Sequence, residues 1–170
     1  WRGTRPPQGR DAPRLPAGSA APHRGKGVDS AGLKVQSPSI GLDAPLVRRV
    51  GTSAPNNVKR VWWSSRSAVP GKKGNAFLFG HTYDSNPNGV GVLDHLKRLR
   101  VGKLVKITMG DTTVTCKVKK VVRNAPLHLS ERAMAKLLSH LGSPRATMTT
   151  CLWSKKQGKY VSRVNAEMAC

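Results

Sequence analysis

Carboxylates are scarce in this chain. Its 170 residues hold 8 Asp and Glu against 30 Lys and Arg, a formal charge of +22 with an isoelectric point near 11.2. Because protein calcium sites and paired-acid catalytic sites need several carboxylates, the shortage argues against both. The excess of cations points instead to an anionic partner, which is most often nucleic acid, a surface polymer or a lipid head group.

Long apolar runs and paired cysteine motifs are missing too. No stretch reaches the roughly 18 apolar residues that a membrane-spanning helix needs. The chain has three cysteines, Cys116, Cys151 and Cys170, and no CxxC pair, which argues against a disulfide scaffold and a structural zinc site. We expect no cofactor and no obligate metal.

Since the chain begins at Trp1 rather than Met, we expect it to be a fragment whose signal peptide or membrane anchor lies outside it.

Composition divides the chain into two parts. The first 27 residues contain five prolines, five glycines and six basic residues with almost nothing to bury. We therefore predict a basic, Pro/Gly-rich disordered linker over residues 1–30 and a folded domain over residues 31–170.

Apolar patterning in the second part predicts mostly strands. Residues 35–47 are predicted as a single extended segment with bends. Further short apolar or alternating runs are predicted as strands at 61–63, 75–80, 105–109, 114–118, 146–153 and 160–169.

Two helices are predicted between these strands. Helical spacing indicates one over residues 92–99, and a second that Ser130 caps, that continues to Leu141 and that Gly142 ends. Adjacent pairs of strands, without regular strand–helix alternation, favour a mainly β barrel or sandwich with two or three short helices.

Three side chains are candidates for chemistry. Cys151 ends a Thr-rich strand beside a lysine-rich loop, and nearby cations make a thiol more nucleophilic; the alternative is an inert buried cysteine, the commoner fate. His81 follows an apolar strand and Gly80, where a proton-transfer group is well placed, although a structural histidine is at least as common. Arg163 would face the cysteine strand if the last strand pairs with it, and is otherwise ordinary surface charge.

The other histidines and cysteines point less clearly to chemistry. His95, His128 and His140 have no acidic or cysteine partner at metal spacing. Cys116 shares the predicted inward face of its strand with apolar neighbours, so we expect it to be buried and inert. A disulfide between Cys116 and Cys170 remains open in an oxidising setting, because sequence does not give the distance.

Taken together, these motifs resemble bacterial sortases, in particular the actinobacterial class E and F kind. The resemblance covers residues 35–170 and rests on the order and spacing of five segments: Pro38 to Val47, Gly74-Asn75-Ala76, Phe79-Gly80-His81, Thr147 to Cys151, and Arg163-Val164. The family's cysteine strand reads Thr-Leu-x-Thr-Cys, and Met148 stands here at the Leu position.

The resemblance implies a closed eight-stranded sortase-like β-barrel and a cysteine transpeptidase. Cys151 would be the nucleophile, His81 the general acid and base, and Arg163 the stabiliser of the substrate and its oxyanion, with Thr150 beside them in contact with substrate. The implied partners are an LPxTG-like sorting-signal peptide of secreted proteins and an amine of a wall precursor or pilin. The implied location is the bacterial cell surface, on the extracellular side of the plasma membrane.

Two other functions remain open at the level of sequence. One is a cysteine hydrolase on the same framework. The other is a non-catalytic module that binds nucleic acid or wall polyanions, and a polyanion contact through the basic surface is also compatible with an enzyme. The basic stretch in question comprises Lys97, Arg98, Arg100, Lys103, Lys106, Lys117, Lys119, Lys120 and Arg123. It lacks the interleaved aromatic residues that stack on single-stranded bases.

Overall fold

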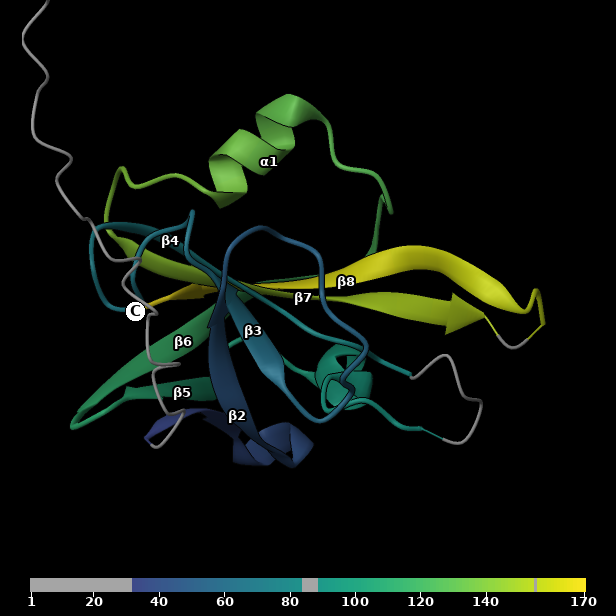
Figure 1. The fold of residues 1–170 in the computed structure, drawn as a ribbon, viewed down its shortest axis with the longest axis horizontal. Coiled ribbons are helices and arrows are strands. Elements are labelled where there is room, and N and C mark those ends of the chain that lie inside the picture. The colour runs from purple at the N-terminus through teal and green to yellow at the C-terminus, as the bar shows by residue number, and fades with distance from the viewer. Residues whose placement is uncertain (1–31, 84–88, 155) are drawn as a thin grey trace, which may run out of the picture.

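The computed structural model describes residues 32–83, 89–154 and 156–170 (Figure 1). The predicted linker, residues 1–30, lies outside the described residues and stays a prediction. The elements run in the order β1 (Leu33–Ser37), η1 (Pro38–Ile40), β2 (Leu42–Arg49), β3 (Val61–Ser64), β4 (Gly74–Phe79), η2 (Asp94–Arg98), β5 (Leu104–Met109), β6 (Thr112–Ala125), α1 (Glu131–Leu137), β7 (Pro144–Ser154) and β8 (Lys159–Ala169), where η marks a 3-10 helix.

The eight strands close into a barrel in the order β1-β2-β3-β4-β7-β8-β6-β5. The pairs β2–β3 and β4–β7 are parallel, whereas the other neighbours are antiparallel. This confirms the predicted mainly β, closed eight-stranded barrel with a few short helices. The β7–β8 hairpin extends beyond the barrel body on one side (Figure 1).

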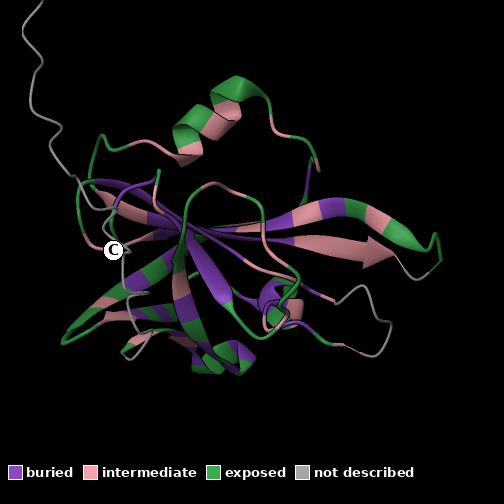
Figure 2. Cartoon of the chain, viewed as in Figure 1, coloured by how far each residue is buried: buried purple, intermediate pink, exposed green. Residues whose placement is uncertain are grey.

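Side chains along each strand alternate between the barrel interior and the outside. In β7, Ala146 and Met148 belong to the main apolar core, so Thr147, between them, and Thr149, after them, face outward. The same alternation gives the β5–β6 hairpin its stripes of buried and exposed residues (Figure 2). Leu93, Leu96 and Leu99, around η2, are fully buried in the same core.

One predicted segment is wrong in its organisation. Residues 35–47 are not a single extended stretch but two antiparallel strands, β1 and β2, separated by the 3-10 turn η1. Pro38 starts that turn, and Gly41 ends it in the left-handed region with φ 65°, which glycine adopts without steric cost. The chain therefore folds back on itself where only a bend was expected.

The predicted helices are shorter than expected. The one at 92–99 is a 3-10 helix over five residues, Asp94–Arg98. Ser130 caps α1 as predicted, accepting a hydrogen bond from the Ala133 amide, but the helix ends at Leu137 rather than Leu141. The carbonyls of Leu137 and Ser139 accept hydrogen bonds from the side chain and backbone of Asn75, so tertiary contacts with β4 replace the next helical turn.

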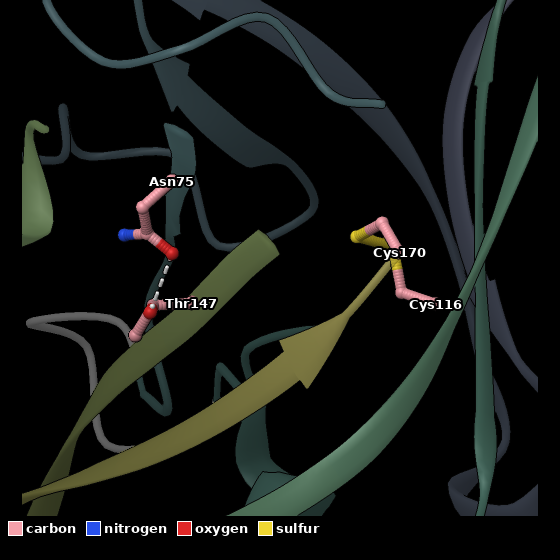
Figure 3. The surroundings of a disulfide bond; sticks show 4 residues. All are labelled: Asn75, Cys116, Thr147 and Cys170. Atoms are coloured by element: carbon pink, nitrogen blue, oxygen red, sulfur yellow. Dashed lines mark hydrogen bonds between the residues drawn. A yellow bond between two sulfur atoms is a disulfide. The ribbon is translucent and has the colours of Figure 1, made fainter. Parts of the chain in front are cut away.

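Cys116 is fully buried, as expected, but it is not a free inert thiol. It forms a disulfide with Cys170, which follows β8 directly, and the bond joins β6 to the end of the chain (Figure 3). The pairing left open by the sequence is therefore present. Cys151 is the free cysteine among the three.

Candidate functional site

The candidate residues from the last two strands lie side by side. Cys151 of β7 is the direct cross-strand partner of Arg163 of β8. Their neighbour Val164 is buried in the core, so the alternation of the strand turns Arg163 outward, and Cys151 shares that face. The hairpin expected from the sequence thus brings a thiol and a guanidinium together on the outer wall of the barrel.

Among the described residues, Arg163 has no carboxylate partner. The salt bridge found within the described residues joins His95 to Asp94, and does not involve Arg163. Its Nε atom is buried and has no hydrogen-bond partner in the described part of the chain. Burial raises the pKa of the Cys151 thiol above its usual value, and the positive charge of Arg163 offsets part of that rise.

His81 lies just beyond the end of β4, the strand on the other side of β7. Phe79 pairs with Thr149, and the Gly80 amide donates a 3.2 Å hydrogen bond to the Thr149 carbonyl. Continuing this parallel register by two residues sets His81 level with Cys151. No hydrogen bond between His81 and either of the other two candidates occurs in the described parts of the chain.

The imidazole of His81 is held from the β3 side. Its Nε2 atom lies 2.7 Å from the Pro55 carbonyl, and the ring stands edge-on to Trp62 with centroids 5.8 Å apart. Since a carbonyl only accepts, Nε2 carries the proton in this contact. The Nδ1 atom is therefore the nitrogen left to exchange a proton with a bound molecule.

Thr150 connects the histidine segment to the cysteine strand. It is buried, and its hydroxyl donates to the Gly80 carbonyl at 2.9 Å and lies 2.8 Å from the Thr82 hydroxyl. The Thr82 hydroxyl in turn donates to the Cys151 carbonyl. The residues that flank His81 are thus bonded to Cys151 and its neighbour. Contact between Thr150 and substrate stays a prediction.

Gly91 packs against the backbone of the same segment. Its amide donates to the Thr82 carbonyl at 2.7 Å, and a Cβ at this position would lie 2.1 Å from the His81 carbonyl oxygen. Only glycine allows this approach. The roles of Gly91, Thr82, Pro55 and Trp62 were not predicted from the sequence, because nothing in their local sequence shows that they converge on His81.

A cavity of about 190 Å³ opens on the outward face of the same strands, beneath α1. It is lined by Asn75, Leu129, Ala133, Lys136, Leu137, Arg145, Ala146, Thr147, Asn165, Glu167 and Met168. Asn75, one of these lining residues, accepts a 3.0 Å hydrogen bond from the Thr147 hydroxyl (Figure 3). Thr149, the next outward residue of β7, donates to Asn165 at 2.6 Å. A row of polar side chains therefore leads from the cavity to Cys151 and Arg163.

Nothing in the described ranges gathers three or more potential metal ligands at one point. His95 and His140 lie apart from the site: His95 faces Asp94 on η2, and His140 contacts the Arg66 carbonyl.

Comparison with known proteins assigns the class. The sortase domain family matches residues 35–168, which is most of the chain. The chain therefore belongs to the sortase family, whose members are transpeptidases that act at the cell surface.

Solved sortase structures share the fold at low sequence identity. Sortase D5 of Clostridium perfringens, described as a transpeptidase, is 18% identical with a TM-score of 0.60, over 81% of this chain and 76% of that one. The pilus-related sortase C of Group B Streptococcus is 16% identical with a TM-score of 0.64, over 84% and 68%. A lid mutant of sortase A from Corynebacterium diphtheriae is 18% identical with a TM-score of 0.61, over 81% and 68%.

None of the curated proteins compared with the chain matches it. The class E or F assignment stays a prediction. Within the described residues, no helix is long and apolar enough to cross a membrane.

Proposed function

We propose that the chain is a cysteine transpeptidase that cleaves an LPxTG-like sorting signal and transfers its acyl part to a cell-surface amine, anchoring proteins to the wall or joining pilins. The observation that carries the proposal is the cross-strand pairing of the free thiol Cys151 with Arg163, a guanidinium without a carboxylate partner in the described residues. A nucleophile beside fixed hydrogen-bond donors is what acyl transfer requires.

The first half-reaction forms a thioester. The Cys151 thiolate attacks the carbonyl carbon of the scissile bond, and Arg163 donates hydrogen bonds to the oxyanion that develops. The C–N bond then breaks, and the His81 imidazolium gives a proton to the departing amine. Because burial raises the thiol pKa, thiolate is a minor species at neutral pH and the enzyme reacts from that fraction.

The second half-reaction releases the product. The acceptor amine attacks the thioester carbonyl, its proton passes to neutral His81, and the C–S bond breaks to restore the Cys151 thiolate. If water took the place of the amine, the same residues would give the hydrolase considered above. The two outcomes differ only in which nucleophile reaches the thioester first.

The distance along β7 from the cavity to Cys151 fits a short extended signal. From Thr147 at the cavity to Cys151 is about 13 Å, at roughly 3.3 Å per strand residue. In an extended Leu-Pro-x-Thr-Gly peptide with the Thr–Gly bond at Cys151, the Leu lies about 10 Å upstream. We expect this Leu to lie at the cavity, where Ala133, Leu137 and Met168 supply apolar lining.

Incubation with LPxTG-like and LAxTG-like peptides, with and without triglycine as the amine, tests the proposal by mass spectrometry. We expect a thioester on Cys151, a ligated product when triglycine is present, and neither in Cys151→Ala. Ligation that persists in Cys151→Ala would overturn the assignment of the nucleophile. Free acid alone, at saturating triglycine, would identify a hydrolase instead.

A further inference from the structure

Six exposed lysines gather on one wall of the barrel, away from the candidate site. They lie on β1, just before β5, on β5 and on β6: Lys34, Lys103, Lys106, Lys117, Lys119 and Lys120, here called the lysine face. The register shows that they share a side of the sheet. Lys106 is opposite Gln36 and Thr115, while the intervening Val105 and Cys116 are buried inside.

No ion pair within the described residues neutralises the charge of the lysine face. None of its lysines takes part in a salt bridge in the part of the chain that the structure describes. Three carboxylates border it: Asp43 on β2, bonded to Gln36; Asp111 in the β5–β6 turn; and Glu167, opposite Lys120 on β8. An uncompensated cluster of this kind favours an external polyanion.

Two exposed apolar side chains stand among these lysines. Leu104 is 49% exposed and is the direct cross-strand partner of Lys117, and Val101, just before Lys103, is 64% exposed. Apolar residues next to lysines suit a partner that is anionic at its surface and apolar beneath it. A bilayer of anionic phospholipids has both properties. A soluble polymer of phosphates would make no use of the apolar pair.

The lysine face is centred away from Cys151. In the closed strand order, β1 is four strands from β7 in either direction and β5 is three, whereas β6 is two strands away and next to β8. The β6 edge of the face therefore reaches Lys120, whose cross-strand partner Glu167 lines the cavity. A surface against β1, β5 and the adjoining part of β6 leaves the outward face of β4 and β7 uncovered, so contact at the lysine face and peptide binding along β7 are compatible in one molecule.

We propose that the lysine face, with Val101 and Leu104, docks the domain onto a bilayer rich in anionic phospholipid. The lysines lie over the head groups as point charges, and the two apolar side chains enter the interface. This interaction is independent of the proposed function, since it uses neither the proposed reacting residues nor the residues that line the cavity.

Sedimentation with vesicles of phosphatidylcholine and phosphatidylglycerol tests the proposal on the full chain. Each lysine near an anionic surface strengthens binding about fivefold, so the triple variant Lys106→Gln/Lys117→Gln/Lys119→Gln should bind roughly a hundredfold more weakly. The matched control Lys59→Gln/Lys72→Gln/Lys73→Gln removes the same charge from exposed positions elsewhere, and should change binding far less. Equal losses in the two variants would show that only net charge matters and would overturn the proposal.

Leu104→Ser separates lipid from polymer. We expect it to weaken binding to anionic vesicles severalfold and to leave binding to soluble polyphosphate unchanged. If Leu104→Ser binds vesicles like the parent chain while the triple variant loses polyphosphate, the face takes a polymer and the lipid assignment is wrong. The alkylation rate of Cys151, measured in every variant, reports an intact fold whether or not the proposed transpeptidase activity is found.

Discussion

Short side chains set the spacing between the groups proposed to react. The Thr150 hydroxyl donates to the Gly80 carbonyl and the Thr82 hydroxyl donates to the Cys151 carbonyl, so the residues on either side of His81 are fixed in level against β7. Neither threonine supplies chemistry of its own in the proposed reaction. Their value is positional, because misplacing a reacting group by about 1 Å can cost a hundredfold in rate.

The effect of the Arg163 charge on the pKa of the Cys151 thiol should be measurable. Removing that charge in Arg163→Gln raises the pKa of the thiol, so the thiolate fraction falls at every pH below that pKa and alkylation by iodoacetamide slows. We expect the midpoint of the rate–pH profile to rise in Arg163→Gln, and to stay near the parent value in Arg163→Lys. Cys151 is the free thiol, so the signal reports it alone. An unchanged midpoint in Arg163→Gln would contradict the interaction.

Gly91→Ala should displace His81 without touching Cys151. The added methyl would lie 2.1 Å from the His81 carbonyl oxygen, which forces the segment to move. Acyl transfer is expected to fall about 10- to 100-fold, with the alkylation rate of Cys151 unchanged. Val90→Ala, at the exposed neighbouring residue, is the control. Equal transfer by the two variants would mean that His81 does not depend on this packing.

Residues with intrinsic chemistry could be predicted, while those that position them could not. Cys151, His81 and Arg163 stand at strand ends or in a hairpin, and their chemistry is visible in the sequence. Thr82 and Gly91 acquire their roles only once β4 lies beside β7, a parallel pairing across more than sixty residues whose register the sequence does not state.

At the scale of elements, α1 roofs the cavity yet buries none of its own residues fully. It is held against β4 and its neighbour. The buried Asn75 side chain donates to the Leu137 carbonyl at 2.7 Å and accepts from Thr147, and Leu137 packs against the apolar cluster of Trp62, Phe77 and Phe79. A helix of seven residues is too short to be stable alone. The position of α1 therefore depends on these contacts, to which the Asn75 amide contributes two hydrogen bonds.

Asn75→Ala should loosen α1 and weaken peptide binding. Losing both hydrogen bonds leaves buried groups unpaired, at a cost of about 1–3 kcal/mol. We expect KM to rise about five- to tenfold and amide exchange in α1 to accelerate, with kcat within about twofold, because the reacting residues lie beyond the cavity. Asn124→Ala, at an exposed asparagine of β6, is the control. A fall in kcat at constant KM would instead place Asn75 in the chemistry.

At the scale of the whole molecule, the disulfide ties the last strand into the barrel. Cys116 and Cys170 are 54 residues apart, and the loop between them includes α1, β7 and β8. Both Cys151 and Arg163 lie within that closed loop. Cross-linking it restricts the unfolded chain far more than the folded one.

Reduction of the Cys116–Cys170 disulfide should lower the free energy of unfolding by about 2–4 kcal/mol. The measurement is urea unfolding of Cys151→Ala with and without dithiothreitol, since this background removes the free thiol that could exchange with the disulfide. We expect a lower midpoint in reductant, matched by Cys116→Ala/Cys170→Ala without it. Identical midpoints in all three would show that the cross-link contributes nothing.

The sequence by itself determined most of the elements and the candidate residues. Alternation and turn residues indicated the strands other than β1 and β2, Ser130 marked the start of α1, and the order of motifs indicated a sortase, because these signals depend on neighbours along the chain. Only the tertiary structure decided which strands close the barrel, where α1 stops, that Cys116 pairs with Cys170, and that lysines from three strands form one face. Those outcomes depend on contacts between distant segments, whose geometry arises when the core packs and the barrel closes.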